Sequence, residues 1–158
     1  MLYSDGSGNG LDFKFSNCYA NVNITQNATA VCCVGGFVGF KYEDYSTAIT
    51  NCFATGNIAS TSSLSGNRIG GLVGLIENAF SNRVAFPFEN CFRYDGQTIS
   101  VNAGAINTTG EECTLSDLND SNFYTEILGW SADIWDFSDL DFANGKLPTL
   151  KSIVPIVI

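Results

Sequence analysis

The sequence contains no histidine, and this absence removes the most common general base of enzymes and the imidazole ligands of most catalytic zinc sites. Basic residues are also scarce, with 7 Lys plus Arg against 16 Asp plus Glu and a formal net charge of −9. A nucleic-acid-binding surface needs clustered basic residues. We therefore expect no nucleic-acid partner, and any catalysis would have to use carboxylates, Lys or Tyr.

Long apolar runs are missing as well. The longest apolar stretch, near residues 30–40, is far shorter than the roughly 20 residues that a membrane-spanning helix needs, so we expect no membrane insertion. No basic region followed by an apolar core stands at Met1, and we expect the chain to be part of a longer one whose targeting signal lies upstream or has been removed. With 158 residues, 45% hydrophobic, the chain suffices for one domain with its own core.

Two short patterns recur along the chain. Asn-Cys-aromatic occurs at 17–19, 51–53 and 90–92, each time with an apolar residue three positions before the cysteine. Gly-Gly-apolar-Val-Gly occurs at 35–39 and again at 70–74. The Asn-Cys copies are 34 and 39 residues apart and the glycine copies 35 apart, a period that is typical of stacked repeat proteins.

Each Asn-Cys copy alternates between two kinds of side chain. Cys18 and Ala20 share one parity, whereas Tyr19 and Asn21 share the other, which predicts strands with a narrow, small-residue inner face. The segments between the strands consist of turn residues, and no apolar period of 3.6 residues persists between residues 1 and 110. Repeats of this kind stack well as a parallel solenoid with a strand spacing of roughly 4.8 Å.

The two patterns together resemble the GLUG repeat, which is known from bacterial surface and secreted proteins and from regions flanking the catalytic part of some immunoglobulin A peptidases. AITNCFATGNI at 48–58 with IGGLVG at 69–74 is a nearly complete copy, and FSNCYANVNI with VGGFVG at 34–39 is a slightly altered one. FENCFRYDG is a degenerate third copy whose glycine-rich partner is NAGAIN at 102–107. The resemblance covers residues 11–110 and implies a β-helix-like module without catalytic residues.

We therefore predict an all-β fold: a right-handed parallel β-helix, or β-solenoid, of about three coils over residues 1–110. Residues 111–158 are predicted to form a C-terminal capping segment of the same structural domain that covers the open end of the stack. Thr114 or Ser116 would cap a short helix there, and IVPIVI would form one more strand or an unpaired tail. Positions that resemble the final segment of such proteins are Leu128, Gly129, Trp130, Trp135, Asn144, Gly145, Leu147 and Pro148.

Most of the repeated residues have a structural interpretation. The asparagines would stack at a corner and hydrogen-bond between coils, the cysteines would form a ladder of buried free thiols, and the glycines would allow a tight corner or a close backbone approach. Ligand binding by the asparagines, disulfide, metal or redox roles for the cysteines, and a phosphate-cradling loop at the glycines are the alternatives. We expect no metal and no cofactor. The ladder residues are Asn17, Asn51, Asn90, Cys18, Cys52, Cys91, Gly35, Gly36, Gly70 and Gly71.

Two sets of residues are candidates for binding or chemistry. The aromatic row of Tyr19, Phe53 and Phe92 would either stack on sugars or a protein partner, or pack under a flanking part of the chain. The acids between residues 133 and 141 would form a solvated face, a calcium site or a carboxylate-only catalytic pair. These acids are Asp133, Asp136, Asp139 and Asp141.

From these patterns we predict a non-enzymatic, extracellular or bacterial cell-surface module, adhesin-like or a spacer, that binds a host protein or a glycan. A carbohydrate-active β-helix enzyme and an accessory domain of a larger surface protease are the alternatives. The enzyme would require convergent carboxylates from successive coils, and the repeats carry almost none at equivalent positions.

Overall fold

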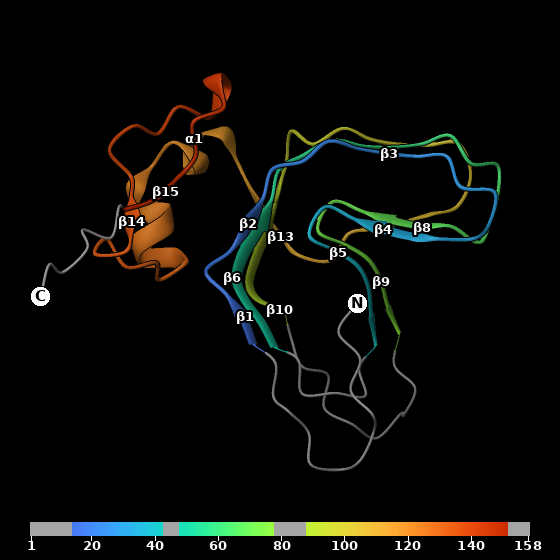
Figure 1. Cartoon of the computed structure of the whole chain (residues 1–158), viewed down its shortest axis with the longest axis horizontal. Helices are drawn as coiled ribbons and strands as arrows, with labels where there is room; N and C mark the ends of the chain where they lie inside the picture. The colour runs from blue at the N-terminus through green and yellow to red at the C-terminus, as the bar shows by residue number, and fades with distance from the viewer. Residues whose placement is uncertain (1–13, 43–47, 78–87, 152–158) are drawn as a thin grey trace, which may run out of the picture.

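A computed structural model describes residues 14–42, 48–77 and 88–151. In these residues the chain winds around three times, and successive turns follow nearly the same path when viewed as in Figure 1. The turns contribute short strands to several parallel sheets, in which each strand pairs with a strand of the neighbouring turn. The prediction of an all-β parallel solenoid of about three coils is confirmed.

The strands have the following bounds, coil by coil. The first coil contains β1 (Lys14–Ser16), β2 (Tyr19–Ala20), β3 (Ile24–Gln26), β4 (Cys33–Gly35) and β5 (Val38–Tyr42). The second contains β6 (Ala48–Ala54), β7 (Ile58–Ser60), β8 (Arg68–Gly70) and β9 (Val73–Glu77). The third contains β10 (Phe88–Tyr94), β11 (Ile99–Val101) and β12 (Ala105–Asn107), and is followed by β13 (Glu111–Cys113).

The register between coils places equivalent repeat residues side by side. β1 and β2 both pair with β6, which pairs with β10, which pairs with β13. Strands β3, β7 and β11 form a second sheet, β4, β8 and β12 a third, and β5 pairs with β9. Cys52 lies opposite Cys91, and Gly35 opposite Gly70, so the sequence period is one coil.

The repeated asparagine marks a bend in the first sheet. Asn17, Asn51 and Asn90 have φ values of 57°, 56° and 49°, a left-handed conformation that Asn tolerates better than other residues with a Cβ. Their amides also form a ladder: Asn51 Nδ2 donates to Asn17 Oδ1, and Asn90 Nδ2 donates to Asn51 Oδ1, both at 3.2 Å. The bend explains why the repeat places its apolar residue three positions before the cysteine, because it returns both side chains to the same side.

The interior of the coils is lined by small and branched apolar side chains. Cys52 and Ala54 are fully buried there, together with Leu72 and Val73 of the second coil. At Gly70 two backbone segments lie very close together, since an added Cβ would overlap the carbonyl oxygen of Val73. The inner parity predicted for the Asn-Cys strands is therefore confirmed, and the glycine pattern is explained by the close backbone approach.

Residues 114–151, here called the flanking segment, lie beside the stack in Figure 1, against the outer side of the sheet formed by β6 and its neighbours. This differs from the predicted cover over the end of the stack. The physical reason is that the outward aromatic side chains of all three coils are wholly or partly buried by packing against this segment. The segment contains α1 (Leu115–Leu118), the π-helix η1 (Phe123–Ile127), β14 (Trp135–Asp136), the 3-10 helix η2 (Phe142–Asn144) and β15 (Thr149–Leu150).

The helix start predicted in the flanking segment is confirmed. Thr114 caps α1 by accepting from the backbone N–H of Asp117, and the Asp117 carboxylate accepts from the backbone N–H of Thr114. The IVPIVI tail lies outside the described residues. Across the described ranges, no helix has the length and apolar character needed to span a membrane.

Candidate functional site

The outward aromatic residues of the three coils lie one above another beneath the flanking segment. Tyr19, Phe53 and Phe92 occupy one register position, and the Tyr19 and Phe53 rings are stacked with centroids 5.3 Å apart at 15°. Phe53 is 0% exposed and Phe92 is 7% exposed, whereas Tyr19 is only partly buried. Of the three candidate binding residues, Tyr19 alone presents part of its ring at the surface.

The flanking segment contributes its own aromatic residues to this cluster. Trp130 packs against Phe53 at 5.7 Å and against Trp135 at 4.4 Å between ring centroids. Tyr124 is fully buried, donates its hydroxyl to the carbonyl oxygen of Leu118 at 2.8 Å, and has its pKa raised by burial. The flanking segment and the stack therefore share one hydrophobic core.

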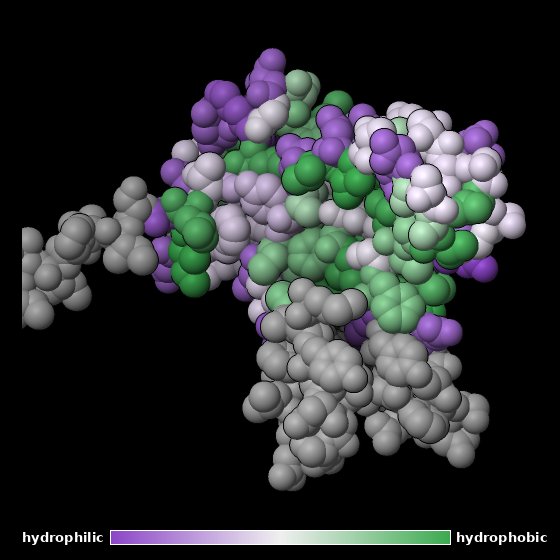
Figure 2. Space-filling model, turned by 45° about the vertical axis from the view of Figure 1, so that its right-hand side comes forward, coloured by the Kyte–Doolittle hydropathy of each residue, from purple (hydrophilic) through white to green (hydrophobic). Residues whose placement is uncertain are grey.

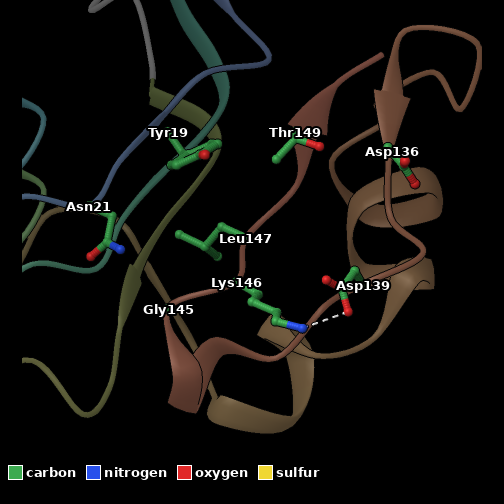
Figure 3. Close-up of a pocket in the computed structure, with 8 residues that line it drawn as sticks. All are labelled: Tyr19, Asn21, Asp136, Asp139, Gly145, Lys146, Leu147 and Thr149. Carbon is green, nitrogen blue, oxygen red and sulfur yellow. Dashed lines mark hydrogen bonds and ion pairs between the residues drawn. The ribbon is translucent and has the colours of Figure 1, made fainter. Parts of the chain in front are cut away.

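A cavity of about 640 Å³ lies where the first coil meets the flanking segment. Figure 3 shows its lining, with Tyr19 and Asn21 on one side and residues from the strands and turns of the flanking segment around the rest. The Tyr19 hydroxyl donates a hydrogen bond of 3.1 Å to the carbonyl oxygen of Pro148, which fixes the ring at the cavity wall. The lining residues are Tyr19, Asn21, Asp136, Asp139, Gly145, Lys146, Leu147 and Thr149.

Charged groups lie at the rim of this cavity. Lys146 Nζ is 2.8 Å from Asp139 Oδ1, and the hydrogen bond together with the charge of Asp139 raises the pKa of Lys146. The Asp136 carboxylate accepts from the backbone N–H of Ser138 at 2.9 Å, and hydrogen bonds from Ser138 lower the pKa of Asp136. Asp136 also lies directly opposite Thr149 in the antiparallel pair of β14 and β15.

The arrangement of the acids favours hydrogen bonding over acid catalysis. A general acid for glycoside cleavage needs a raised carboxyl pKa, and that of Asp136 is shifted in the opposite direction. Asp141 accepts from Asn144 Nδ2 at 2.7 Å and stabilises the turn at η2, while Asp133 is an exposed residue outside the lining. Within the described ranges, no group of three or more Cys, Asp or Glu side chains is arranged to hold a metal ion.

The repeated cysteines lie inside the stack, away from this cavity. All six cysteines of the chain are free thiols, and Cys52 and Cys91 are buried neighbours on adjacent coils. The contact with Cys91 and burial raise the pKa of Cys52, and burial raises the pKa of Cys113 to about 12. Cys52 and Cys113 therefore stay protonated at neutral pH, and the buried thiols pack as small apolar groups.

Sequence reasoning did not select several of the cavity residues as candidates. Asn21 follows the first Asn-Cys copy on the same parity as Tyr19, so strand alternation predicts that both point outward. Lys146 is one of only 7 basic residues and lies close in sequence to the acids at 133–141. Leu147 is one of the positions that resemble the final segment and Thr149 is not, and no sequence feature places either of them next to Tyr19.

Comparison with known proteins finds one match. The GLUG motif matches residues 30–59, which include β4 and β5 of the first coil and β6 of the second. Neither the comparison with curated proteins nor that with solved structures finds a match.

Proposed function

This chain carries the GLUG motif, and we propose that it is a non-enzymatic, ligand-binding module of a secreted or cell-surface protein. The observation that supports this role most directly is the cavity where the first coil meets the flanking segment. Clefts of a few hundred cubic ångströms that combine an aromatic wall with a few polar groups are typical binding sites. A host glycan or a host surface protein is the class of ligand that we propose.

The repeated residues support a binding role over a catalytic one. The Asn17 and Asn51 amides bond to each other between coils, and the thiols of Cys52 and Cys91 are buried. The rim carboxylates are also committed, since Asp139 is paired with Lys146 and hydrogen bonds hold Asp136 in its ionised form. The other groups that line the cavity, among them Tyr19, Asn21 and Thr149, are suited to hydrogen bonding and ring stacking.

Binding and catalysis can be separated in one set of assays. The purified chain is applied to an array of neutral and sulfated glycans and to immobilised extracellular-matrix proteins, and it is incubated separately with soluble polysaccharides. We expect saturable binding to at least one ligand and no release of reducing ends above that of heat-denatured protein. Release of reducing ends that Asp136→Asn abolishes would contradict the proposal, as would the absence of any bound ligand.

A spacer role is the second candidate, and the exposed apolar residues of the first coil favour it. Phe15 is 39% exposed there, whereas its counterpart one coil further, Ile49, is 3% exposed. Val22 and Val31, also in the first coil, are 59% and 61% exposed, and Figure 2 shows apolar patches among polar residues on the described surface. Asn51 and Asn90 each donate to the asparagine of the preceding coil, whereas Asn17 has no preceding coil within the described part of the chain.

A tandem duplication tests the spacer role. Duplicating residues 14–47 adds one period of 34 residues ahead of the first coil. If the edge accepts a further coil, Tm and the urea m-value both rise, because more surface is buried on folding. The added coil would also place a ring over Tyr19, so a spacer and a Tyr19-dependent binding site predict opposite effects on ligand binding.

A further inference from the structure

We propose that the cavity at the first coil binds an uncharged, hydroxyl-rich saccharide whose ring stacks on Tyr19. This inference rests on the proposed ligand-binding function and narrows it to one ligand class and one set of contacts. Tyr19 lies at the first-coil end of the aromatic row and lines the cavity together with several polar residues.

Tyr19 provides a fixed flat surface. One face of its ring packs on Phe53 at 5.3 Å, the rings of Trp130 and Trp135 lie at 6.3 and 6.2 Å, and its hydroxyl is held by the Pro148 carbonyl at 3.1 Å. Every later ring of the row is covered by the coil before it, whereas the first-coil ring borders the cavity. A ring that is immobilised before binding loses little conformational freedom when a ligand stacks on it.

The cavity lining that includes Tyr19 also contains polar groups of the types that bond to hydroxyl groups. Asn21 Oδ1 already accepts from Thr55 Oγ1 at 3.0 Å, which orients the amide and leaves its nitrogen as a donor toward the cavity side. Asp136 already accepts from Ser138, but its carboxylate has further lone pairs that can accept, and Thr149 lies directly opposite it on the neighbouring strand. Acceptors and donors placed around an aromatic face are what an alternating set of sugar hydroxyls requires.

The charge of the lining and the size of the cavity favour a small, neutral ligand. The lining carries two carboxylates and one ammonium group, and the whole chain has a formal net charge of −9, so sulfated or phosphorylated ligands are repelled. The lining contains a single large aliphatic side chain, Leu147, which is only 8% exposed, beside the ring of Tyr19. A cavity of about 640 Å³ accommodates one or two sugar rings.

Saturation-transfer NMR followed by calorimetry tests this assignment on the full chain. The probes are lactose, maltose, cellobiose and diacetylchitobiose, with a sulfated disaccharide as the charged comparison, each at about 10 mM, a concentration that reveals weak binding. We expect transfer to the ring protons of at least one neutral probe and none to the sulfated probe. The Kd of the bound probe is then measured for three variants.

Tyr19→Leu removes the flat ring, and Thr149→Arg places a large side chain in the cavity from an exposed strand position. Tyr94→Leu is the control, because Tyr94 is also a partly buried tyrosine that packs on a ring, that of Phe142 at 4.9 Å, and lies outside the cavity lining. We expect the first two variants to raise Kd by about tenfold or more and the control to leave it unchanged. Thr149→Arg keeps the test decisive if Tyr19→Leu unfolds the protein.

Two results would overturn the saccharide site and leave the proposed function standing: binding of a protein or sulfated ligand alone, or binding of a neutral sugar that all three variants retain. The absence of any ligand in both this screen and the array would overturn the saccharide site and the proposed function together.

Discussion

The indole N–H of Trp130 donates a hydrogen bond of 2.9 Å to the backbone carbonyl oxygen of Asn51. Asn51 is the left-handed residue at which β6 bends, and Trp130 is 1% exposed. The flanking segment is thus bonded to the backbone bend of the middle coil as well as packed on the outward rings. We infer that the flanking segment and the stack fold together as one cooperative unit.

Replacing Trp130 by Phe tests this connection. The variant retains a ring but leaves the Asn51 carbonyl without its donor, and we expect the free energy of unfolding to fall by about 1–3 kcal/mol. Trp135→Phe is the control, since Trp135 stacks on Trp130 but is only partly buried. Urea denaturation followed by circular dichroism measures both variants. Equal losses for the two would contradict a specific role for the indole hydrogen bond.

Asn51 combines a backbone role with a side-chain role, and two substitutions separate them. Asn51→Gly keeps the left-handed conformation at no steric cost but loses both amide hydrogen bonds of the ladder. Asn51→Ala loses the same bonds and adds about 1–2 kcal/mol of left-handed backbone strain. We expect Asn51→Ala to be the less stable variant in urea unfolding. If Asn51→Ala were as stable as Asn51→Gly, or more stable, the left-handed backbone at the bend would not be the reason for Asn at this position.

The glycine pattern predicts a large difference between two glycine-to-alanine variants. At Gly70 an added methyl group overlaps the backbone carbonyl of Val73, and we expect Gly70→Ala to cost about 3 kcal/mol or more. At Gly129 the φ is +65° but the space is open, so only the conformational cost of about 1–2 kcal/mol applies. Thermal unfolding distinguishes them. Comparable Tm values for the two variants would argue against the close backbone approach.

The buried thiol of Cys113 predicts a loss of stability in alkaline solution. Its pKa is raised to about 12 from an ordinary value of 9.0, so the unfolded chain releases this proton first as the pH rises. The contribution of the protonated thiol is complete below pH 9 and declines as the pH rises from 9 toward 12, by about 1.4 kcal/mol per pH unit.

Urea unfolding between pH 7 and pH 10.5 measures this decline, with Cys113→Ala as the comparison. The variant is expected to be less stable at neutral pH because of the cavity that it creates, but its stability should fall less steeply above pH 9. Parallel slopes for the two proteins would mean that Cys113 does not remain protonated in the folded state.

The sequence predicts the stack because each coil repeats the same local requirements. Asn at the bend, Cys on the inner face and Gly at the close approach recur at one period, and strand alternation then assigns the inner parity. The same alternation places Tyr19 and Phe53 on the outer side, but it does not reveal what covers them. The pattern leaves both alternatives open, a binding row and a row packed under a flanking part of the chain.

The flanking segment is less predictable because its contacts join residues far apart in the chain. Trp130 bonds to Asn51 across 79 positions, and Tyr19 bonds to Pro148 across 129 positions. No repeat constrains such contacts, so the large aromatic residues indicated a cover without indicating which surface they cover. The cavity depends on this docking and was therefore beyond sequence reasoning, although Tyr19 itself was among the candidates.

If the cavity where the first coil meets the flanking segment is a ligand site, NMR mapping of the ¹⁵N-labelled chain detects it most directly. The protein is titrated with the neutral disaccharide that binds most tightly. We predict chemical-shift changes concentrated at Tyr19, Asn21, Asp136, Leu147 and Thr149, which line the cavity. Changes confined to other surfaces, such as the exposed edge around Val22 and Val31, would contradict the account.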